Sequence, residues 1–237
     1  MTTVSSTSEA PWLIGLRGAR ANLVPGLILQ AVALAIALAY YFYAPVRNAL
    51  EDLSAFRVST GFAYSIVATG FFGGVLPCLY LYAQPATRGR YSFAQCTALT
   101  AFWAYKGLEV DLLYKVLAKT VGADTSVQTV TTKMILDQFI YCPLLAVPLT
   151  VVVYAWIETR FDARSVWADL RTPRWYQRRA IPLLISNLGV WVPTVCIVYS
   201  LPTSLQIPLF NLVLCFFTLL VAHLSAHSKP EAQGTRP

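Results

Sequence analysis

The stretch from Lys106 to Pro143, KGLEVDLLYKVLAKTVGADTSVQTVTTKMILDQFIYCP, carries charged side chains inside segments that are otherwise apolar. Four charges lie in the first segment and three polar side chains open the next: Lys106, Glu109, Asp111 and Lys115, then Lys133, Asp137 and Gln138. A charge at the centre of a membrane costs about 2.5–3.5 kcal/mol, so four unpaired charges facing lipid would cost on the order of 10 kcal/mol. We therefore expect these groups to pair and to face the interior of a helix bundle.

Helical spacing offers each acidic side chain a basic partner on its own helix. Residues three or four positions apart share one face of an α-helix, where opposite charges meet. Three pairs have this spacing: Lys106–Glu109, Asp111–Lys115 and Lys133–Asp137. We expect these pairs to face inward, with the second and third coupled to each other across the two helices.

The composition is typical of a membrane protein. Hydrophobic residues make up 57% of the 237 residues and charged residues only 12%, whereas soluble domains contain about 25% charged residues. The net charge of +7 does not indicate nucleic-acid binding, because the basic residues lie in short connectors rather than on one soluble face. The five cysteines lie in apolar segments without C-x-x-C spacing, so we expect free thiols, no metal site and no cofactor.

Six apolar stretches reach or approach the length of about 20 helical residues that a membrane requires. They are residues 23–43, 60–82, 92–117, 132–156, 181–200 and 206–223. The sequence therefore predicts an all-α, multi-pass transmembrane helix bundle with about six spans. We expect a single domain over residues 21–225, between disordered tails at 1–20 and 226–237.

Glycines and prolines inside these stretches indicate how the helices pack and bend. Gly70 and Gly74 form a G-x-x-x-G pattern, which allows two helices to approach closely. Prolines interrupt the later stretches, for example Pro143, Pro148 and Pro193. Because proline removes a backbone hydrogen bond and crowds the preceding turn, we expect kinked helices whose freed carbonyls find other donors.

The distribution of basic residues predicts the orientation. With six spans, twelve of the Lys and Arg residues lie on the side of the two termini and four on the opposite side, which places both termini inside. The most basic connector, residues 160–179, interleaves arginines with Trp175 and Tyr176. This connector either binds anionic lipid head groups or serves only to fix the orientation.

The segment KMILDQFIYCPLL, residues 133–145, resembles a motif of the peroxisomal twenty-two-kilodalton membrane protein family, whose mitochondrial inner-membrane member is called Mpv-seventeen. The resemblance covers about residues 100–222. The residues that fit the family pattern are Gly107, Tyr114, Leu117, Lys133, Asp137, Gln138, Pro143, Trp191, Pro193, Tyr199, Pro202 and Asn211. The sequence departs from the pattern where the family has Gly-Pro and His before this segment, at the additional acids Glu109 and Asp111, and at Phe216–Phe217, where the family has Trp.

The resemblance implies a channel-like membrane protein. Members of the family are generally described with four membrane-spanning helices, whereas this sequence predicts six spans. Together with the buried charges, it predicts a pore for small hydrophilic solutes. The expected pore or polar-core residues are Lys106, Glu109, Asp111, Lys115, Lys133, Asp137, Gln138 and Asn187. The expected membrane is a bacterial cell membrane or an organelle membrane, either mitochondrial inner or peroxisomal.

Two other functions stay open at this point. The charges could form a structural ion-pair cluster in a non-transporting membrane scaffold. A membrane enzyme is less favoured, because the sequence contains no G-x-S-x-G, H-E-x-x-H or phosphate-loop motif. Membrane lipid is the expected partner, a homo-oligomer remains an alternative, and no nucleic acid is expected.

Overall fold

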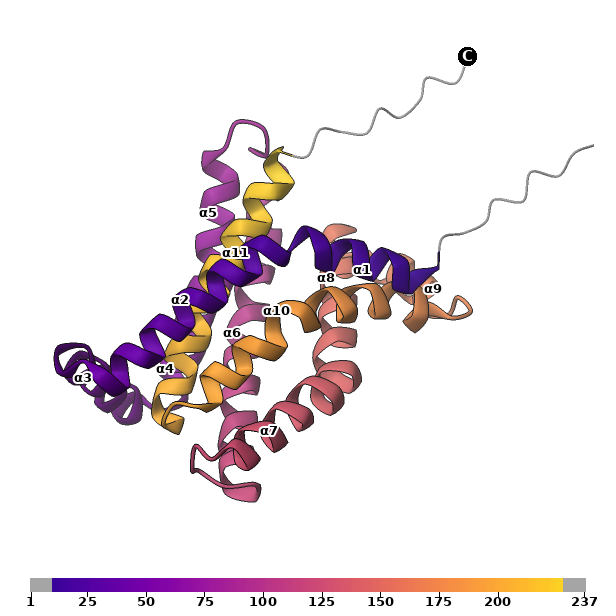
Figure 1. Cartoon of the computed structure of the whole chain (residues 1–237). Coiled ribbons are helices and arrows are strands. Elements are labelled where there is room, and N and C mark those ends of the chain that lie inside the picture. Colours follow the sequence, from indigo (N-terminus) through magenta and orange to yellow (C-terminus); the bar gives the residue numbers. More distant parts are fainter. Residues whose placement is uncertain (1–9, 228–237) are drawn as a thin grey trace, which may run out of the picture.

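Helices cross one another in a bundle that leaves only short connectors (Figure 1). The structure is a computed structural model that describes residues 10–227, and side chains up to residue 219. The elements are α1 Pro11–Ala21, α2 Leu23–Phe42, α3 Ala44–Thr60, α4 Phe62–Gly70, η1 Phe71–Val75, α5 Leu76–Ala83, α6 Phe93–Thr120, α7 Val127–Ile135, η2 Leu136–Ala146, α8 Val147–Glu158, α9 Ala163–Leu170, η3 Tyr176–Ala180, α10 Ile181–Tyr199 and α11 Thr203–His227. The elements named η are π-helical, with wider turns than an α-helix. The prediction of an all-α fold is confirmed.

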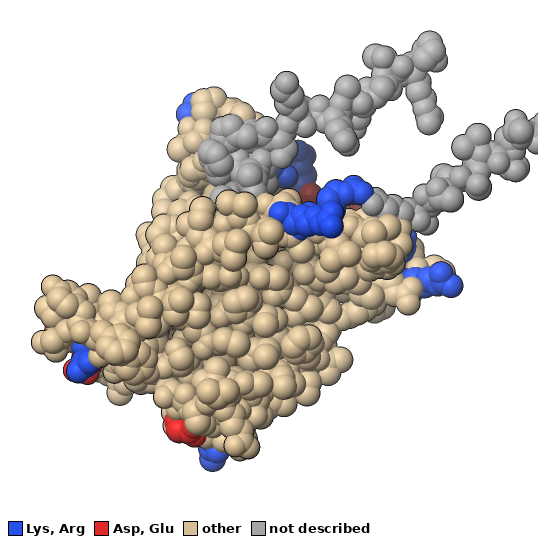
Figure 2. Space-filling model, in the orientation of Figure 1, with Lys and Arg blue, Asp and Glu red and all other residues tan. Residues whose placement is uncertain are grey.

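Within the described residues, four continuous helical stretches are long and apolar enough to cross a membrane: Leu23–Phe42, Phe62–Ala83, Val127–Glu158 and Tyr176–Tyr199. Large apolar side chains on them remain open to the surroundings, such as Leu27 at 55% and Leu144 at 76% exposure. The face shown in Figure 2 is mostly uncharged, and the charged side chains lie towards its ends. An exposed apolar surface of this extent fits lipid rather than water, so the fold is that of an α-helical membrane protein.

All six apolar stretches of the sequence are helical. The two beyond the four spans above are α6, which carries the buried charges, and α11, whose apolar part runs over Thr203–Leu219. Three further helices of the described residues, α1, α3 and α9, were not predicted. α3 joins the first stretch to the second, and α9 lies in the basic connector.

The predicted N-terminal tail is wrong over residues 11–20, which belong to α1. This helix lies along α10 (Figure 1), and a Cβ added at Gly15 would lie 2.8 Å from the Cβ of Ile185. The predicted C-terminal tail is wrong for residues 226 and 227, which continue α11. Residues 1–9 and 228–237, where the remainder of both tails was predicted, lie outside the described part of the chain.

A seam of glycines brings α4 and η1 against α6. A Cβ at Gly74 would lie 2.5 Å from the Cα of Thr100, and one at Gly70 would lie 3.1 Å from the Cβ of Ala104. On the facing side of the seam, in α6, a Cβ at Gly107 would lie 2.1 Å from the backbone oxygen of Ser65. The close contact predicted from the G-x-x-x-G pattern is confirmed.

Prolines explain where the π-helical turns occur. A proline ring crowds the carbonyl four residues earlier. For Pro77, Pro143 and Pro182, that carbonyl lies in η1, η2 and η3 respectively. The wider π-helical turn accommodates the ring without ending the helix. By contrast, Pro193 lies within the α-helical turns of α10.

An aromatic core joins α6, α10 and α11. The rings of Tyr114 and Tyr199 pack edge to face with centroids 5.2 Å apart, and both side chains are 1% exposed. The ring centroid of Phe210 lies 6.4 Å from that of Tyr114 and 5.4 Å from that of Trp191. This core holds one side of the polar site in place.

Candidate functional site

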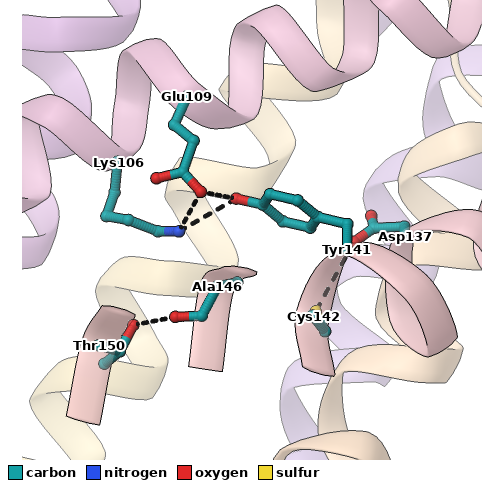
Figure 3. A network of polar contacts seen from close by, with 7 residues as sticks. All are labelled: Lys106, Glu109, Asp137, Tyr141, Cys142, Ala146 and Thr150. Atoms are coloured by element: carbon teal, nitrogen blue, oxygen red, sulfur yellow. Dashed lines mark hydrogen bonds and ion pairs between the residues drawn. The ribbon is translucent and has the colours of Figure 1, made fainter. Parts of the chain in front are cut away.

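Three side chains from α6 and η2 form a closed polar contact inside the bundle (Figure 3). The Nζ of Lys106 lies 2.9 Å from Glu109 Oε1 and 3.0 Å from the hydroxyl of Tyr141. The Tyr141 hydroxyl in turn donates to Glu109 Oε1. The predicted Lys106–Glu109 pair is therefore confirmed, and Tyr141 joins it to the next helix. We call Lys106, Glu109 and Tyr141 the bridging cluster.

Asp137 lies beside this cluster in η2 and is 4% exposed. Its carboxylate accepts hydrogen bonds from the Tyr199 hydroxyl at 2.7 Å and from Gln138 Nε2 at 3.2 Å. The thiol of Cys142 lies 3.8 Å away, five residues along the chain, a spacing that the wide π-helical turn brings onto one face (Figure 3). Among the side chains described, every hydrogen-bond donor to this carboxylate is uncharged.

The predicted pair between Lys133 and Asp137 is wrong. Tyr199 occupies the position between them: its hydroxyl binds Asp137, and the Lys133 Nζ lies 5.7 Å from the centre of its ring. Lys133 is 1% exposed, and its Nζ has no hydrogen-bond acceptor among the described side chains. Because the Lys133–Asp137 pair does not form, it cannot couple to the Asp111–Lys115 pair as predicted.

Asp111 belongs to a separate network on the other side of α6. It is fully buried and accepts hydrogen bonds from Arg57 of α3 and, at 2.5 Å, from Ser65 of α4. The predicted partner Lys115 is also present, at 3.5 Å, although its side chain is 38% exposed. We call Arg57, Ser65, Asp111 and Lys115 the α3–α6 network.

Arg57 was not predicted as a site residue, because its position just before the second apolar stretch suggested a connector. Its side chain is only 6% exposed. The available signal was its closeness to that stretch, which allows a long side chain to reach a buried acid on a neighbouring helix. Tyr141 and Cys142 were also missed, since neither carries a charge at neutral pH.

A cavity of about 690 Å³ connects the polar site with one end of the bundle. Of the predicted site residues, Lys106, Asp137, Gln138 and Asn187 line it. Glu109, Asp111, Lys115 and Lys133 lie outside the lining, and of these Asp111 and Lys133 are fully buried polar residues of the bundle. The candidate site is therefore the cavity with its inner polar end, and the α3–α6 network lies outside it.

The lining of the cavity is rich in aromatic rings and has charges at both ends. The rings come from Tyr91, Trp103, Tyr114, Tyr141, Tyr154, Trp175, Trp191, Phe210 and Phe217. Arg90, Glu158 and Arg179 lie where the connectors meet the helices. Asp169 pairs with Arg179 at 3.2 Å and accepts a hydrogen bond from Trp175 at 3.1 Å, which fixes part of the predicted basic connector against the cavity mouth.

The residues that carried the family resemblance occupy packing or bonding positions. Gly107 lies in the α4–α6 seam, Tyr114 and Trp191 line the cavity, and Asn211 accepts a hydrogen bond from Thr69 at 2.8 Å. Four more of these positions lie within or at the ends of helices. The carbonyl of Pro143 accepts a hydrogen bond from Tyr176 at 2.8 Å, and that of Pro202 accepts one from the backbone of Leu205 at the start of α11. Pro193 lies within α10, and Tyr199 bonds Asp137.

The connector between α6 and α7 lies outside the membrane-spanning segments and is fixed by Asp124. Its carboxylate accepts hydrogen bonds from the backbone N–H of Ser126 and the hydroxyl of Thr129, both at 3.0 Å. Hydrogen bonds from Ser126 and then Thr129 lower the pKa of Asp124 to about 2, so this side chain stays ionised near the N-terminus of α7, where the helix dipole favours an anion.

Within the described residues, no group of three or more His, Cys, Asp or Glu side chains is placed to hold a metal ion. No family model matches the chain, and comparisons with curated proteins and with solved structures also gave no match. The class of the protein is therefore the one that its fold defines, an α-helical membrane protein, and its function has to be argued from the cavity.

Proposed function

We propose that this protein is a channel-like membrane protein for small hydrophilic solutes, and that the cavity is the vestibule of its path. The observation that carries the proposal is the cavity of about 690 Å³ that reaches two buried charges, Lys106 in the middle of α6 and Asp137 in η2. Charged groups inside a membrane are costly, and they commonly mark a route for polar solutes. A purely structural pair would not need a cavity beside it.

The bridging cluster is placed to close the inner end of this vestibule. Tyr141 and Lys106 line the cavity and hold Glu109 behind it. These contacts tie η2 to α6, so a solute that continues past them must separate the two elements. The π-helical turns of η2 suit such a movement, because they commonly occur at functional positions in helices.

We further propose six spans with both termini inside. At one end of the bundle, the Tyr41 hydroxyl at the end of α2 bonds the carbonyl of Ser200, just before α11. At the other, Tyr91 before α6 contacts Glu158 at the end of α8 at 3.5 Å. Connectors on alternate sides of six crossings would meet in this way. The mouth of the cavity then opens towards the basic side of the protein, on the same side of the membrane as the two termini.

The span count predicts opposite labelling of alternate connectors by a membrane-impermeant maleimide. In a cysteine-free background, single cysteines at the exposed positions Glu51 and Thr125 should be labelled from outside the cell or vesicle. Cysteines at Arg88 and Arg164 should be labelled only from inside. Labelling of positions 51 and 88 from the same side would reject six spans.

Conductance of the purified, reconstituted protein tests the channel. We expect weak conductance without sharp ion selectivity, because the lining holds charges of both signs rather than a ring of one sign. Glu109→Gln should raise the open fraction several-fold, since a neutral amide holds Lys106 and Tyr141 less strongly than a carboxylate. Asp52→Asn removes the same charge at an exposed position of α3 and should leave the conductance unchanged.

Two outcomes would redirect the proposal. Folded protein that leaves the bilayer silent across voltage and pH would favour a non-transporting membrane scaffold. Conductance that Glu109→Gln does not alter would retain a path but remove the bridging cluster as its gate.

We also infer a distant relationship to the peroxisomal twenty-two-kilodalton and Mpv-seventeen family. Its support is the set of motif residues alone, of which Gly107, Trp191, Tyr199 and Asn211 each hold a specific contact between helices. A bacterial cell membrane or an organelle membrane is the proposed location. The proposed partners are anionic lipids, bound at the arginines of residues 160–179, and further copies of the same chain in a homo-oligomer.

A further inference from the structure

The charges at the inner end of the cavity do not balance. Among the described residues that line this end, Lys106 is the basic side chain, and both hydrogen bonds of its Nζ go to members of the bridging cluster. Lys133 is also buried nearby, but it lies outside the lining, faces the ring of Tyr199 and makes no hydrogen bond to Asp137. That leaves Asp137, which lines the cavity and receives only uncharged donors among the described residues. One oxygen of Glu109 is also buried without a donor in the described part of the chain. A buried carboxylate without a cation is expensive in a membrane.

The wall beside Asp137 is aromatic. Tyr199 holds the carboxylate and packs edge to face against Tyr114, which contacts Phe210, which in turn contacts Trp191. Three of these four rings line the cavity. Aromatic faces attract cations, and organic ammonium groups are bound in proteins by rings of this kind.

We infer that the inner end of the cavity binds a small organic cation, with an amine or quaternary ammonium group, and that Asp137 is its counter-ion. The inference rests on the cavity of the proposed function and names its ligand class. A volume of about 690 Å³ lies within the range of about 300–1,000 Å³ common for small-molecule sites. The aromatic and aliphatic side chains of the lining cover the carbon substituents of such a cation, and the carboxylate neutralises its charge.

Anionic ligands fit this end less well. An anion would have to take Lys106 from Glu109, which would leave that carboxylate buried and unpaired. Arg90 and Arg179 lie at the mouth of the cavity, but Arg179 is paired with Asp169. The inner end therefore selects for a positive charge.

Binding by the purified full-length protein in detergent tests the inference. The probes are choline and 3,3-dimethyl-1-butanol, in which carbon replaces the charged nitrogen at nearly the same shape. Trp103 and Trp191 line the cavity, so tryptophan fluorescence reports on occupancy. We expect saturable binding of choline and at least about tenfold weaker binding of the neutral isostere, as for loss of one charged contact. Equal binding of both probes, or binding of neither, would overturn the inference.

Variants separate the carboxylate from the shape of the cavity. Asp137→Asn should weaken choline binding about ten- to hundredfold and leave the isostere unchanged, whereas Asp137→Glu should retain part of the cation preference. Asp52→Asn is the matched control on α3 and should bind as the wild type does. Choline affinity that Asp137→Asn does not change would also overturn the inference, and conductance is not needed for any of these measurements. A protein that conducts but does not prefer choline keeps the proposed function and loses only this ligand class.

Discussion

Replacement of Asp111 with Asn is expected to destabilise the protein by about 3–5 kcal/mol, because it leaves a buried charge without its partner. That charge is Arg57, which is 5% exposed and binds the carboxylate from α3. Its Nε already has no acceptor among the described residues, so no second carboxylate is at hand to compensate. The measurement is unfolding of the purified protein in detergent, followed by circular dichroism.

Two comparisons show which partner matters. Lys115→Met should cost only about 1 kcal/mol, because its side chain is 38% exposed and exposed pairs contribute little. The double variant Arg57→Met with Asp111→Leu removes both buried charges and should recover part of the loss. If Lys115→Met is as damaging as Asp111→Asn, or the double variant shows additive losses, Arg57 is not the main partner.

The sequence predicted that these charges are buried, but it predicted their partners only in part. Helical spacing finds partners on the same helix, and it was sufficient for Lys106 with Glu109 and for Asp111 with Lys115. It has no means of finding Arg57, which lies 54 residues from Asp111 and reaches it from α3 only in the folded protein. Contacts of this kind depend on tertiary structure.

The failure at Lys133 and Asp137 has a different cause. The spacing rule assumes about 3.6 residues per turn, whereas the helix becomes π-helical at Leu136, between the two residues. The wider turn shifts Asp137 towards the bridging cluster, and Tyr199 from α10 fills the position beside Lys133. Pro143 and Pro148 were recognised as sources of distortion, but sequence alone did not indicate that the distortion would begin before Asp137.

The helices formed by the apolar stretches were predicted well, because a run of about twenty apolar residues is typical of a membrane-spanning helix. Helices that lie between them were harder to predict. α3 contains Arg47, Glu51, Asp52 and Arg57, a composition that in isolation is typical of a solvated connector. α1 has only 11 residues and is stabilised by its packing on α10. The cavity was beyond prediction, because it is formed by residues spread across most of the chain.

Substitution of Gly107 by Ala is expected to destabilise the protein by about 3 kcal/mol or more, at the upper end of the range for overpacked cores. A Cβ at this position would lie 2.1 Å from the backbone oxygen of Ser65 and 2.7 Å from the side chain of Thr69. A flexible side chain could move aside, but a backbone oxygen moves only if α4 moves. Ser65 also donates to Asp111, so displacement of α4 would weaken the α3–α6 network as well.

Gly189→Ala provides the matched control for this substitution. In both variants, alanine favours the helix over glycine by about 1 kcal/mol. At Gly189 the added Cβ would meet only the Cβ of Ala19, at an ordinary 3.9 Å, so this variant should be neutral or slightly more stable in the same unfolding measurement. Because the helix preference is shared, the difference between the two variants isolates the contact between α4 and α6. Equal stability of the two variants would mean that α4 does not lie this close to α6, and the glycine seam would then lose its role in positioning both the α3–α6 network and the wall of the cavity.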